Sequence, residues 1–460
     1  MIKKKNIFNH KPEALIFYSF VTAAFLGALL LQLPFAATTK PLSFIDALFM
    51  ATSAVCVTGL SLIDIGTDLT LFGQIVILFL IQLGGLGIMT FSMLFLIFVG
   101  KKIAIAHQLC IPDLSQEISI KNFKYAIVSI VALTATIELI GAVLLYFPFR
   151  ERHSGLFAMY NALFHSISSY CNAGFSLYAD SFMGFSAHPY VMSVVMVLIV
   201  FGGLGFIVLY ELLKVCFRKR RHENKTGISL HTKIALTGSF LFICLGAILI
   251  WCLEHRGIMQ DMPLGHQIFN SLFLSITSRT AGFNTLDTSL LSNPTLLLLL
   301  LFMFVGGCPG STAGGVKIHT FFSLIALTKN KLQGLSMVSL FKRKIPDVVI
   351  DRALTIFISS MLIVFGAVFL LQLVENVTVS HFLVQERKAF LDTLFEAVSA
   401  FGTVGLTTGT TNHLSYLGKI IIILLMFVGR IGPLTLGIAL QMQQKKKLIY
   451  EFPQEEIIVS

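Results

Sequence analysis

Residues 44–61 read FIDALFMATSAVCVTGLS, and the same pattern occurs three more times along the chain. It returns as MYNALFHSISSYCNAGFS at 159–176, IFNSLFLSITSRTAGFNT at 268–285 and FLDTLFEAVSAFGTVGLT at 390–407. Each copy has an Asp or Asn, then Leu-Phe, and later a glycine followed by Leu or Phe. The spacings from Asp46 to Gly59, Asn161 to Gly174, Asn270 to Gly282 and Asp392 to Gly405 are 13, 13, 12 and 13 residues. One structural unit is therefore used four times.

The composition is that of a membrane protein. Of the 460 residues, 55% are hydrophobic and 12% are charged, whereas about 25% are charged in soluble domains. A helix needs about 20 apolar residues to cross a bilayer. Eight runs reach that length, at 14–35, 70–99, 123–149, 190–216, 232–253, 294–327, 353–374 and 416–442. The first run is too long for a signal peptide and no clear cleavage site follows it, so we interpret it as a retained anchor.

Each copy of the motif lies between two apolar runs. A helix of about a dozen residues extends about 18 Å, so it enters a membrane and stops part-way. The Asp or Asn suits its N-cap, and irregular backbone at membrane depth must be buried in protein or line a watery cavity. We therefore predict an all-α polytopic membrane protein of four linked repeats, each a span, a pore loop and a span. Eight transmembrane helices and four re-entrant half-helices would surround a central ion pore.

The predicted boundaries follow from these runs. Residues 1–12 form a cytoplasmic tail, and repeat 1 covers 13–99 with its pore loop at 44–61. Residues 100–217 hold a linker and repeat 2, with the pore loop at 159–176. Residues 218–328 hold a linker and repeat 3, with the pore loop at 268–285 and a gate loop at 306–315. Residues 329–442 hold a linker and repeat 4, with the pore loop at 390–407, and 443–460 form a cytoplasmic tail.

The basic residues predict the orientation. With both termini cytoplasmic, 24 of the 34 Lys and Arg residues lie on the cytoplasmic side and 7 lie outside, which obeys the positive-inside rule. The net charge of +11 is thus explained by topology, and we expect no nucleic-acid binding.

The glycines of the motif suggest a task for the loops. Glycine reaches backbone angles that point successive carbonyls toward an axis, and it lets backbones approach closely. Rings of carbonyl oxygens replace the hydration shell of a cation, and the partly negative ends of the short helices favour positive charge. The alternative is that the glycines only permit close helix packing.

The loops VCVTGLS, CNAGFS, SRTAGFNT and GTVGLT resemble the filter loops of the Trk/Ktr/HKT family of potassium transporters. The resemblance covers essentially the whole chain, and the eight spans with short termini are most similar to the membrane subunits of the Ktr branch. In that family four glycines accompany potassium preference, whereas a serine in the first loop accompanies sodium transport. The resemblance implies that potassium binds at backbone carbonyls of twelve filter residues: Val57, Thr58, Gly59, Asn172, Ala173, Gly174, Thr280, Ala281, Gly282, Thr403, Val404 and Gly405.

The second span of each repeat also contains glycines, in QLGGLGIM at 82–89, VFGGLGFI at 200–207, FVGGCPGSTAGGVK at 304–317 and FVGRIGPLTL at 427–436. The third has five glycines and Pro309 within ten residues, and in a helix each glycine costs about 1 kcal/mol and a proline about 3 kcal/mol. We therefore predict a broken helix. The resemblance implies a gate beneath the filter, made by Gly306, Gly307, Gly310, Ser311, Thr312, Ala313, Gly314 and Gly315. The alternative is a kink that permits close packing.

We single out four charged residues that lie in or near the spans. An arginine at membrane depth is costly, and the resemblance implies that Arg430 faces the pore and bonds to gate-loop carbonyls. Lys317 follows the broken segment and is expected to reach the cytoplasmic interface. Arg279 should point behind the third loop, toward an acidic partner. For Glu138 a structural polar network and an ion-related role both stay open.

The remaining residues indicate no further chemistry in this chain. The seven cysteines have no metal or disulfide spacing, the histidines are not paired, and no phosphate-binding motif is present, so we expect no cofactor. The resemblance implies a nucleotide-binding KtrA-like ring on the cytoplasmic face, where the basic segments 214–233 and 329–352 either bind it or only set topology. It also implies a homodimer in the bacterial inner membrane, with sodium as a coupling or stimulating ion.

Two other functions compete with potassium uptake. A secondary transporter of another cation or a small solute would need polar side chains near the membrane midplane, and the spans have few. An integral membrane transferase would need paired carboxylates, histidines or a metal, and no such constellation is present. We therefore do not expect an enzyme.

Overall fold

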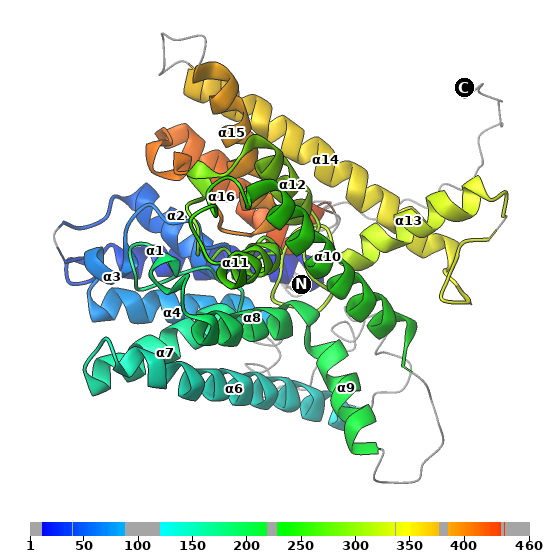
Figure 1. The fold of residues 1–460 in the computed structure, drawn as a ribbon, viewed down its shortest axis with the longest axis horizontal. Coiled ribbons are helices and arrows are strands. Elements are labelled where there is room, and N and C mark those ends of the chain that lie inside the picture. Colours follow the sequence, from blue (N-terminus) through cyan, green and yellow to red (C-terminus); the bar gives the residue numbers. More distant parts are fainter. Residues whose placement is uncertain are drawn as a thin grey trace, which may run out of the picture.

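The chain folds as four helical repeats, each with one helix that carries the motif (Figure 1). The structure is a computed structural model that describes residues 12–38, 40–87, 120–218, 228–335, 337–376, 385–433 and 437. We call α2 (Phe44–Val55), α7 (Gly155–Tyr170), α11 (Leu264–Thr277) and α15 (Gln385–Gly402) the motif helices.

Other helices flank the motif helices in each repeat. The first repeat has α1 (Pro12–Leu31), α3 (Ile65–Asp68) and α4 (Leu71–Gly85), and the second has α6 (Ile120–Arg150), η2 (Met183–Phe185), α8 (Pro189–Leu204) and α9 (Phe206–Arg218). The third has α10 (Leu230–Glu254), η3 (Thr288–Leu290), α12 (Asn293–Phe304) and α13 (Ile318–Leu332). A hairpin of β1 (Ser339–Leu340) and β2 (Arg343–Lys344) precedes α14 (Asp347–Asn376), η4 (Thr410–His413) and α16 (Tyr416–Ile431).

Each of the eight apolar runs contains a helix. Within the described ranges three helices are long and apolar enough to cross a membrane alone, at Val128–Arg150, Leu230–Glu254 and Asp347–Glu375. The pair α8 and α9 also qualifies if it is taken as one bent span. The runs at 70–99 and 416–442 extend outside the described residues, so the number of membrane crossings stays a prediction.

The chain turns at a glycine with a positive φ angle in or after the second long helix of every repeat. These glycines are Gly87, Gly205, Gly310 and Gly432, with φ of 72°, 80°, 73° and 88°. The prediction of a break in the third repeat alone is therefore too narrow, because α8 and α9 also meet at an angle of 100°. The physical reason is a contact between two of these turns, since the Phe206 N–H donates to Gly310 O at 3.3 Å.

The predicted N-caps are wrong, because the Asp or Asn of each motif lies inside its helix. Helix α2 begins two residues before Asp46, with Ser43 as the N-cap. Helices α7 and α11 begin further upstream, where Ser154 and Pro263 supply the start signals. Ser154 takes the N-cap position without a side-chain capping bond, and Pro263 has the fixed φ angle that suits a helix start.

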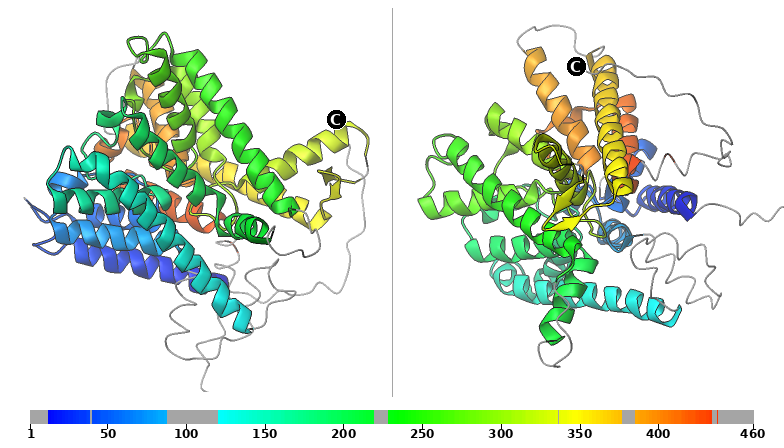
Figure 2. Two further views of the ribbon diagram at one scale, coloured as in Figure 1. Left: turned by 60° about the horizontal axis from the view of Figure 1, so that its bottom comes forward. Right: turned by 90° about the vertical axis from the view of Figure 1, so that its right-hand side faces the viewer.

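The four repeats form a ring in chain order. Helix α4 packs on α7, α8 on α11, α12 on α15, and α16 on α2. The last of these contacts joins the first repeat to the fourth and contains an ion pair of 2.7 Å between Lys419 Nζ and Asp46 Oδ1. Figure 2 shows the helices of all four repeats gathered around a common centre.

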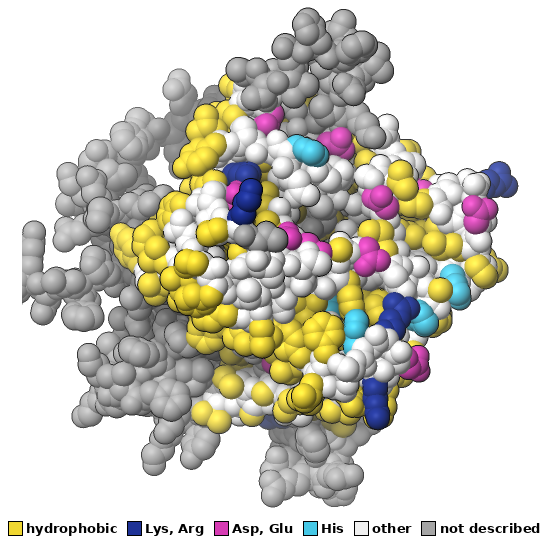
Figure 3. Space-filling model, turned by 90° about the vertical axis from the view of Figure 1, so that its left-hand side faces the viewer, with side chains coloured by type: hydrophobic (Ala, Val, Ile, Leu, Met, Phe, Trp, Pro, Cys, Tyr) yellow, Lys and Arg dark blue, Asp and Glu magenta, His cyan; other side chains and the backbone are white. Residues whose placement is uncertain are grey.

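Large apolar side chains cover much of the exterior, as Figure 3 shows for one face. On α6, α10 and α14, for example, Leu139, Phe240 and Leu362 are 60%, 70% and 68% exposed. An apolar exterior of this extent is suited to lipid and not to water. The structure is thus the helical membrane protein that the composition predicts.

Candidate functional site

Four short loops follow the motif helices, and they share one backbone geometry. We call them the glycine loops: residues 57–61, 172–176, 280–284 and 403–407. In each loop both the glycine and the residue two positions before it have positive φ angles. The pairs are Val57 and Gly59 (57° and 89°), Asn172 and Gly174 (58° and 70°), Thr280 and Gly282 (77° and 75°), and Thr403 and Gly405 (50° and 91°). Positive φ is uncommon for residues with a side chain, so its recurrence shows that the four loops are equivalent.

The four glycines lie in a closed ring. A Cβ atom added to any of them would fall within 2.8 Å of a carbonyl oxygen on the next loop. The pairs are Gly59 with Ala173 O, Gly174 with Ala281 O, Gly282 with Val404 O, and Gly405 with Thr58 O. The carbonyl oxygen before each glycine therefore lies beside the glycine of a neighbouring loop, and the order returns from the fourth loop to the first. A side chain has no room at these positions.

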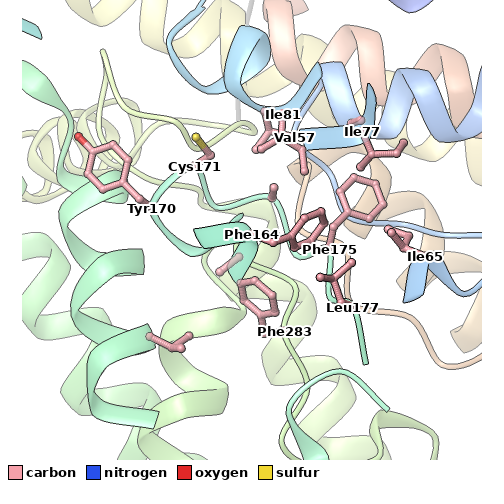
Figure 4. Packing of buried hydrophobic residues seen from close by; sticks show 14 of the residues in the cluster. Val57, Ile65, Ile77, Ile81, Phe164, Tyr170, Cys171, Phe175, Leu177 and Phe283 are labelled. Carbon is pink, nitrogen blue, oxygen red and sulfur yellow. The ribbon is translucent and has the colours of Figure 1, made fainter. Parts of the chain in front are cut away.

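A large apolar residue after each glycine anchors its loop in the core. These residues are Leu60, Phe175, Phe283 and Leu406, each no more than 1% exposed. Figure 4 shows Phe175 and Phe283 near Phe164 of α7, with Leu177 beside them. In the Gly-Leu or Gly-Phe pair of the motif, the glycine thus permits the close approach of the neighbouring loop, and the buried side chain after it fixes the loop in the core.

A hydroxyl seven residues after the motif Asp or Asn ties three of the loops to their helices. The bonds are Ser168 Oγ to Phe175 O at 2.7 Å, Thr277 Oγ1 to Phe283 O at 2.9 Å, and the Gly405 N–H to Ser399 Oγ at 3.1 Å. The spacing from the motif Asp or Asn to the glycine is one residue shorter in the third repeat, and the missing residue falls between Thr277 and Gly282. The Ala281 N–H still reaches Thr277 O at 2.9 Å, so the loop keeps its geometry.

The site where the loops meet offers oxygen atoms. Besides the four carbonyls, the hydroxyls of Thr58, Thr280 and Thr403 are buried and have no hydrogen-bond partner among the described residues. Backbone carbonyls and hydroxyls are neutral oxygen ligands, which suit a cation that loses its water shell. The ring therefore brings together the residues that the sequence predicts as a filter.

The predicted gate residues form a compact loop and not a kinked helix. Between α12 and α13 the 305–317 segment is closed at its base, where the Gly306 N–H donates to Val316 O at 2.9 Å and the Ile318 N–H to Gly307 O at 3.1 Å. Its tip contacts the second repeat through the Cys308 N–H, which donates to Gly203 O at 3.0 Å.

The 305–317 segment lies against the first residues of the third and fourth glycine loops. A Cβ atom on Gly314 would lie 2.8 Å from Thr403 Cγ2, and one on Gly306 would lie 3.3 Å from Thr280 Cγ2. Thr312 Oγ1 also donates to Tyr170 O, at the end of α7, at 3.4 Å. The segment therefore contacts parts of three repeats at the end of the loops where the motif helices stop.

Arg430 spans the space between the 305–317 segment and the first repeat. Its Nη1 donates to Thr312 O, as the predicted contact with gate-loop carbonyls requires. Its Nη2 donates to Gly84 O, near the end of α4. The sequence prediction missed Gly84, although the aligned glycine motifs of the second spans place Gly85 in the position that Arg430 takes in the fourth repeat.

Lys317 does not reach away from the loop, so that prediction is wrong. Its Nζ turns back and donates to Ala313 O at 2.5 Å and to Gly314 O at 3.2 Å. The free carbonyls of an irregular segment attract the ammonium group because few other acceptors are available within the membrane. Three consecutive carbonyls, from Thr312 to Gly314, are thus bound by the cations of Arg430 and Lys317.

Arg279 points behind the third glycine loop, as predicted, but its partner is not acidic. Its Nη1 donates to Ser239 O at 3.3 Å and its Nη2 to Ser239 Oγ at 3.1 Å. The guanidinium therefore ties the third loop to α10 and stays out of the ring.

Glu138 belongs to a polar network behind the second glycine loop. Gln82 Nε2 donates to its two carboxylate oxygens at 3.2 and 3.1 Å. The Cys171 thiol, adjacent to Asn172, lies 3.7 Å from Glu138 Oε1. This geometry favours the structural interpretation, since the carboxylate links α4, α6 and the loop.

Comparisons with known proteins agree with this architecture. Residues 10–448 match a family described as "TrkH: Cation transport protein". The chain is 38% identical over 444 residues to the Ktr system potassium uptake protein B of Bacillus subtilis (strain 168), covering 95% of both chains. It is 36% identical over 447 residues to the protein of the same name from Vibrio alginolyticus, with 96% of this chain and 94% of that one covered.

Two further relatives extend the comparison. The potassium/sodium uptake protein NtpJ of Enterococcus hirae is 34% identical over 462 residues, covering 100% of this chain and 99% of its own. The crystal structure of the potassium transporter TrkH from Vibrio parahaemolyticus has the same fold, with a TM-score of 0.73 and 18% identity over 96% of this chain and 87% of that one. These relatives are named as transport proteins, in line with the prediction that the chain is not an enzyme. On this evidence from sequence and fold together, the chain belongs to the TrkH family of cation transport proteins.

Proposed function

We propose that this protein takes up potassium through a selectivity filter made by the four glycine loops. The single observation that carries the proposal is the closed ring, in which a carbonyl oxygen of each loop lies beside the glycine of a neighbouring loop. Carbonyl oxygens replace the hydration shell of potassium at low cost. Relatives that match nearly the full length are named potassium uptake proteins, which supports potassium as the ion.

The 305–317 segment is the gate in this proposal. It lies against Thr280 and Thr403 at the inner end of the loops, and the cations of Arg430 and Lys317 bind its carbonyls. A permeating cation would meet this positive charge directly after the filter. Movement of the segment, together with its bound cations, would open the path.

Ion flux into proteoliposomes tests the proposed function. We expect the purified protein to admit rubidium, a surrogate for potassium, and to admit an organic solute not at all. Excess potassium should compete strongly with rubidium and excess sodium weakly. Rubidium uptake is also measured with sodium as the only other added cation, because we propose that sodium stimulates transport. One relative is named a potassium/sodium uptake protein. Equal competition by potassium and sodium would contradict a potassium filter.

Arg430 provides the sharpest test of the gate. We expect Arg430→Ala to raise rubidium flux by at least about tenfold, because one hydrogen bond to a charged group contributes about 1.5–3 kcal/mol, tenfold corresponds to about 1.4 kcal/mol, and the change removes two such bonds. Lysine has one compact head with three donors and cannot reproduce the planar fork. Arg430→Lys should therefore restore only part of the closed state, as measured by rubidium uptake at equal amounts of protein in the membrane. Loss of uptake in Arg430→Ala with full recovery in Arg430→Lys would instead show that transport needs the charge itself.

A cytoplasmic regulatory partner also belongs to the proposal. The β1–β2 hairpin lies within the basic segment 329–352, and its side chains Lys342, Arg343 and Lys344 are exposed. Asn330 Nδ2 fixes the hairpin to α13 by donating to Ser339 O at 3.1 Å. A fixed, exposed basic hairpin suits a partner with an acidic surface, and we propose that this partner is the nucleotide-binding KtrA-like ring. Residues 219–227 of the second basic segment, 214–233, lie outside the described residues.

The resemblance to the Trk/Ktr/HKT family also suggests the oligomeric state and the orientation in the membrane. We propose a homodimer with one pore per chain, inserted in the bacterial inner membrane with both termini cytoplasmic. The excess of Lys and Arg on the predicted cytoplasmic segments supports the orientation.

A further inference from the structure

One position of the motif helices repeats a contact that the filter and the gate do not include. It is the residue four positions after the motif Asp or Asn, namely Met50, His165, Leu274 and Glu396. In three repeats its side chain is bonded to the polar residue two positions after the glycine, namely Ser61, Ser176 and Thr407. We call these three contacts the outer braces, because they hold the end of each loop that lies away from the 305–317 segment.

The first two braces use neutral groups. The Leu62 N–H donates to Met50 Sδ at 3.4 Å, and Ser61 Oγ, which also donates to Ile63 O, lies 3.5 Å from the same sulfur. In the second repeat, Ser176 Oγ lies 3.0 Å from His165 Nε2, which also accepts the Leu177 N–H at 3.3 Å. His165 Nδ1 lies 2.8 Å from Asn161 O, so the ring carries its proton there and offers Nε2 as the acceptor.

The fourth brace uses a carboxylate. Glu396 is 1% exposed, and its Oε1 accepts hydrogen bonds from Thr407 Oγ1 and from Thr411 Oγ1, the latter at 3.0 Å. Its Oε2 is buried and has no hydrogen-bond partner within the described part of the chain. The backbone of Thr407 is held from the other side, because Thr288 Oγ1 of the third repeat donates to Thr407 O.

The third repeat has no brace at this position, because Leu274 has no polar group. Its loop is fixed from the neighbouring repeat instead. Ser181 Oγ accepts the Asn284 N–H at 3.1 Å, and the Phe182 N–H donates to Asn284 O at 2.9 Å. The chain thus contains three braced loops and one natural unbraced reference.

We propose that the outer braces are positioning contacts that set ion discrimination, with Glu396 as the strongest. This inference rests on the proposed function, since it assigns a role within the filter. Thr407 is only two residues from Gly405 along the chain, and the buried Leu406 between them fixes the direction of that backbone. A shift of Thr407 would therefore move the carbonyls of the fourth loop. Hydrogen bonds to charged groups are stronger than neutral ones, so the fourth loop should depend most on its brace.

The test compares three variants of the full-length protein in proteoliposomes. Glu396→Leu removes the acceptor, Glu396→Gln keeps a neutral acceptor of the same shape, and Leu274→Ile alters the unbraced reference position without adding an acceptor or a large change in volume. We expect Glu396→Leu to lower the preference for potassium over sodium by about tenfold, given the strength of hydrogen bonds to a charged group. Leu274→Ile should keep the wild-type preference, and Glu396→Gln, which retains an acceptor without the charge, should lose less of it than Glu396→Leu.

The measurement is competition of potassium and sodium against rubidium uptake, with maximal uptake recorded separately. A fold defect alone would reduce maximal uptake and leave the ion preference unchanged. Thr407→Val, which removes the partner hydroxyl, should reproduce the effect of Glu396→Leu, and the double variant should add nothing further. Wild-type preference in both Glu396→Leu and Thr407→Val would overturn the brace, as would an equal loss in Glu396→Gln and Glu396→Leu.

A Gly59→Ser variant in the same assay separates this inference from the proposed function. If Gly59→Ser changes the preference and the Glu396 variants do not, the filter stands and the brace is wrong. If none of the variants changes the preference, the filter itself is wrong.

Discussion

A protein lacking residues 307–314 is expected to take up rubidium at least about tenfold faster than the intact chain, since a barrier lowered by about 1.4 kcal/mol has that effect. The deleted residues include Thr312, whose carbonyl binds Arg430, and the two carbonyls that bind Lys317. The remaining ends already lie together, because the Gly306 N–H donates to Val316 O at 2.9 Å. The loop can therefore be removed at its base without separating α12 from α13.

The control for this deletion is Ser311→Ala, which removes one contact inside the loop, the bond of 3.2 Å that its Oγ accepts from the Ala313 N–H. It should leave the flux low. Both variants are compared at equal membrane content and with equal elution on size-exclusion chromatography. Unchanged or reduced flux in a well-folded deletion variant would show that the segment packs helices and does not gate.

Gly59→Ser is expected to reduce the preference for potassium over sodium by about tenfold, because one strained residue costs about 1–3 kcal/mol and must displace its neighbours. Gly59 has a φ of 89°, and an added Cβ atom would lie 2.5 Å from Ala173 O. The first loop must then move away from the second, which widens the ring. Competition of potassium and sodium against rubidium measures the change.

Gly265→Ser is the matched control for Gly59→Ser. Gly265 lies in α11, and an added Cβ atom would meet nothing within 4 Å. The control should keep the preference and the uptake of the unchanged protein. If Gly59→Ser also kept the full preference for potassium, Gly59 would not belong to a filter.

The four-fold pattern predicts the ring because its repetition is visible in the sequence. The glycines, the apolar residue after each and the spacing of 12 in the third copy all have a direct structural counterpart. The N-caps were not predictable from the motif, because Ser154 and Pro263 start α7 and α11 well before it. Residues upstream of the motif therefore set where these two helices begin.

Contacts between repeats were harder to predict than features within them. The sequence indicates that Arg430 needs acceptors, but Gly84 O becomes one only when the fourth repeat lies beside the first. The bend at Gly205 likewise depends on Gly310 of another repeat. The outer braces correspond to a pattern in the sequence, because each motif glycine is followed two residues later by Ser, Asn or Thr.

The contact between α16 and α2 has a consequence for biosynthesis. Asp46 and Lys419 are 373 positions apart, and Thr58 O meets Gly405 across the same seam. A chain leaving the ribosome has its first repeat long before the fourth exists, so this seam closes last. An unfinished chain therefore lacks the contact that closes the ring of glycine loops.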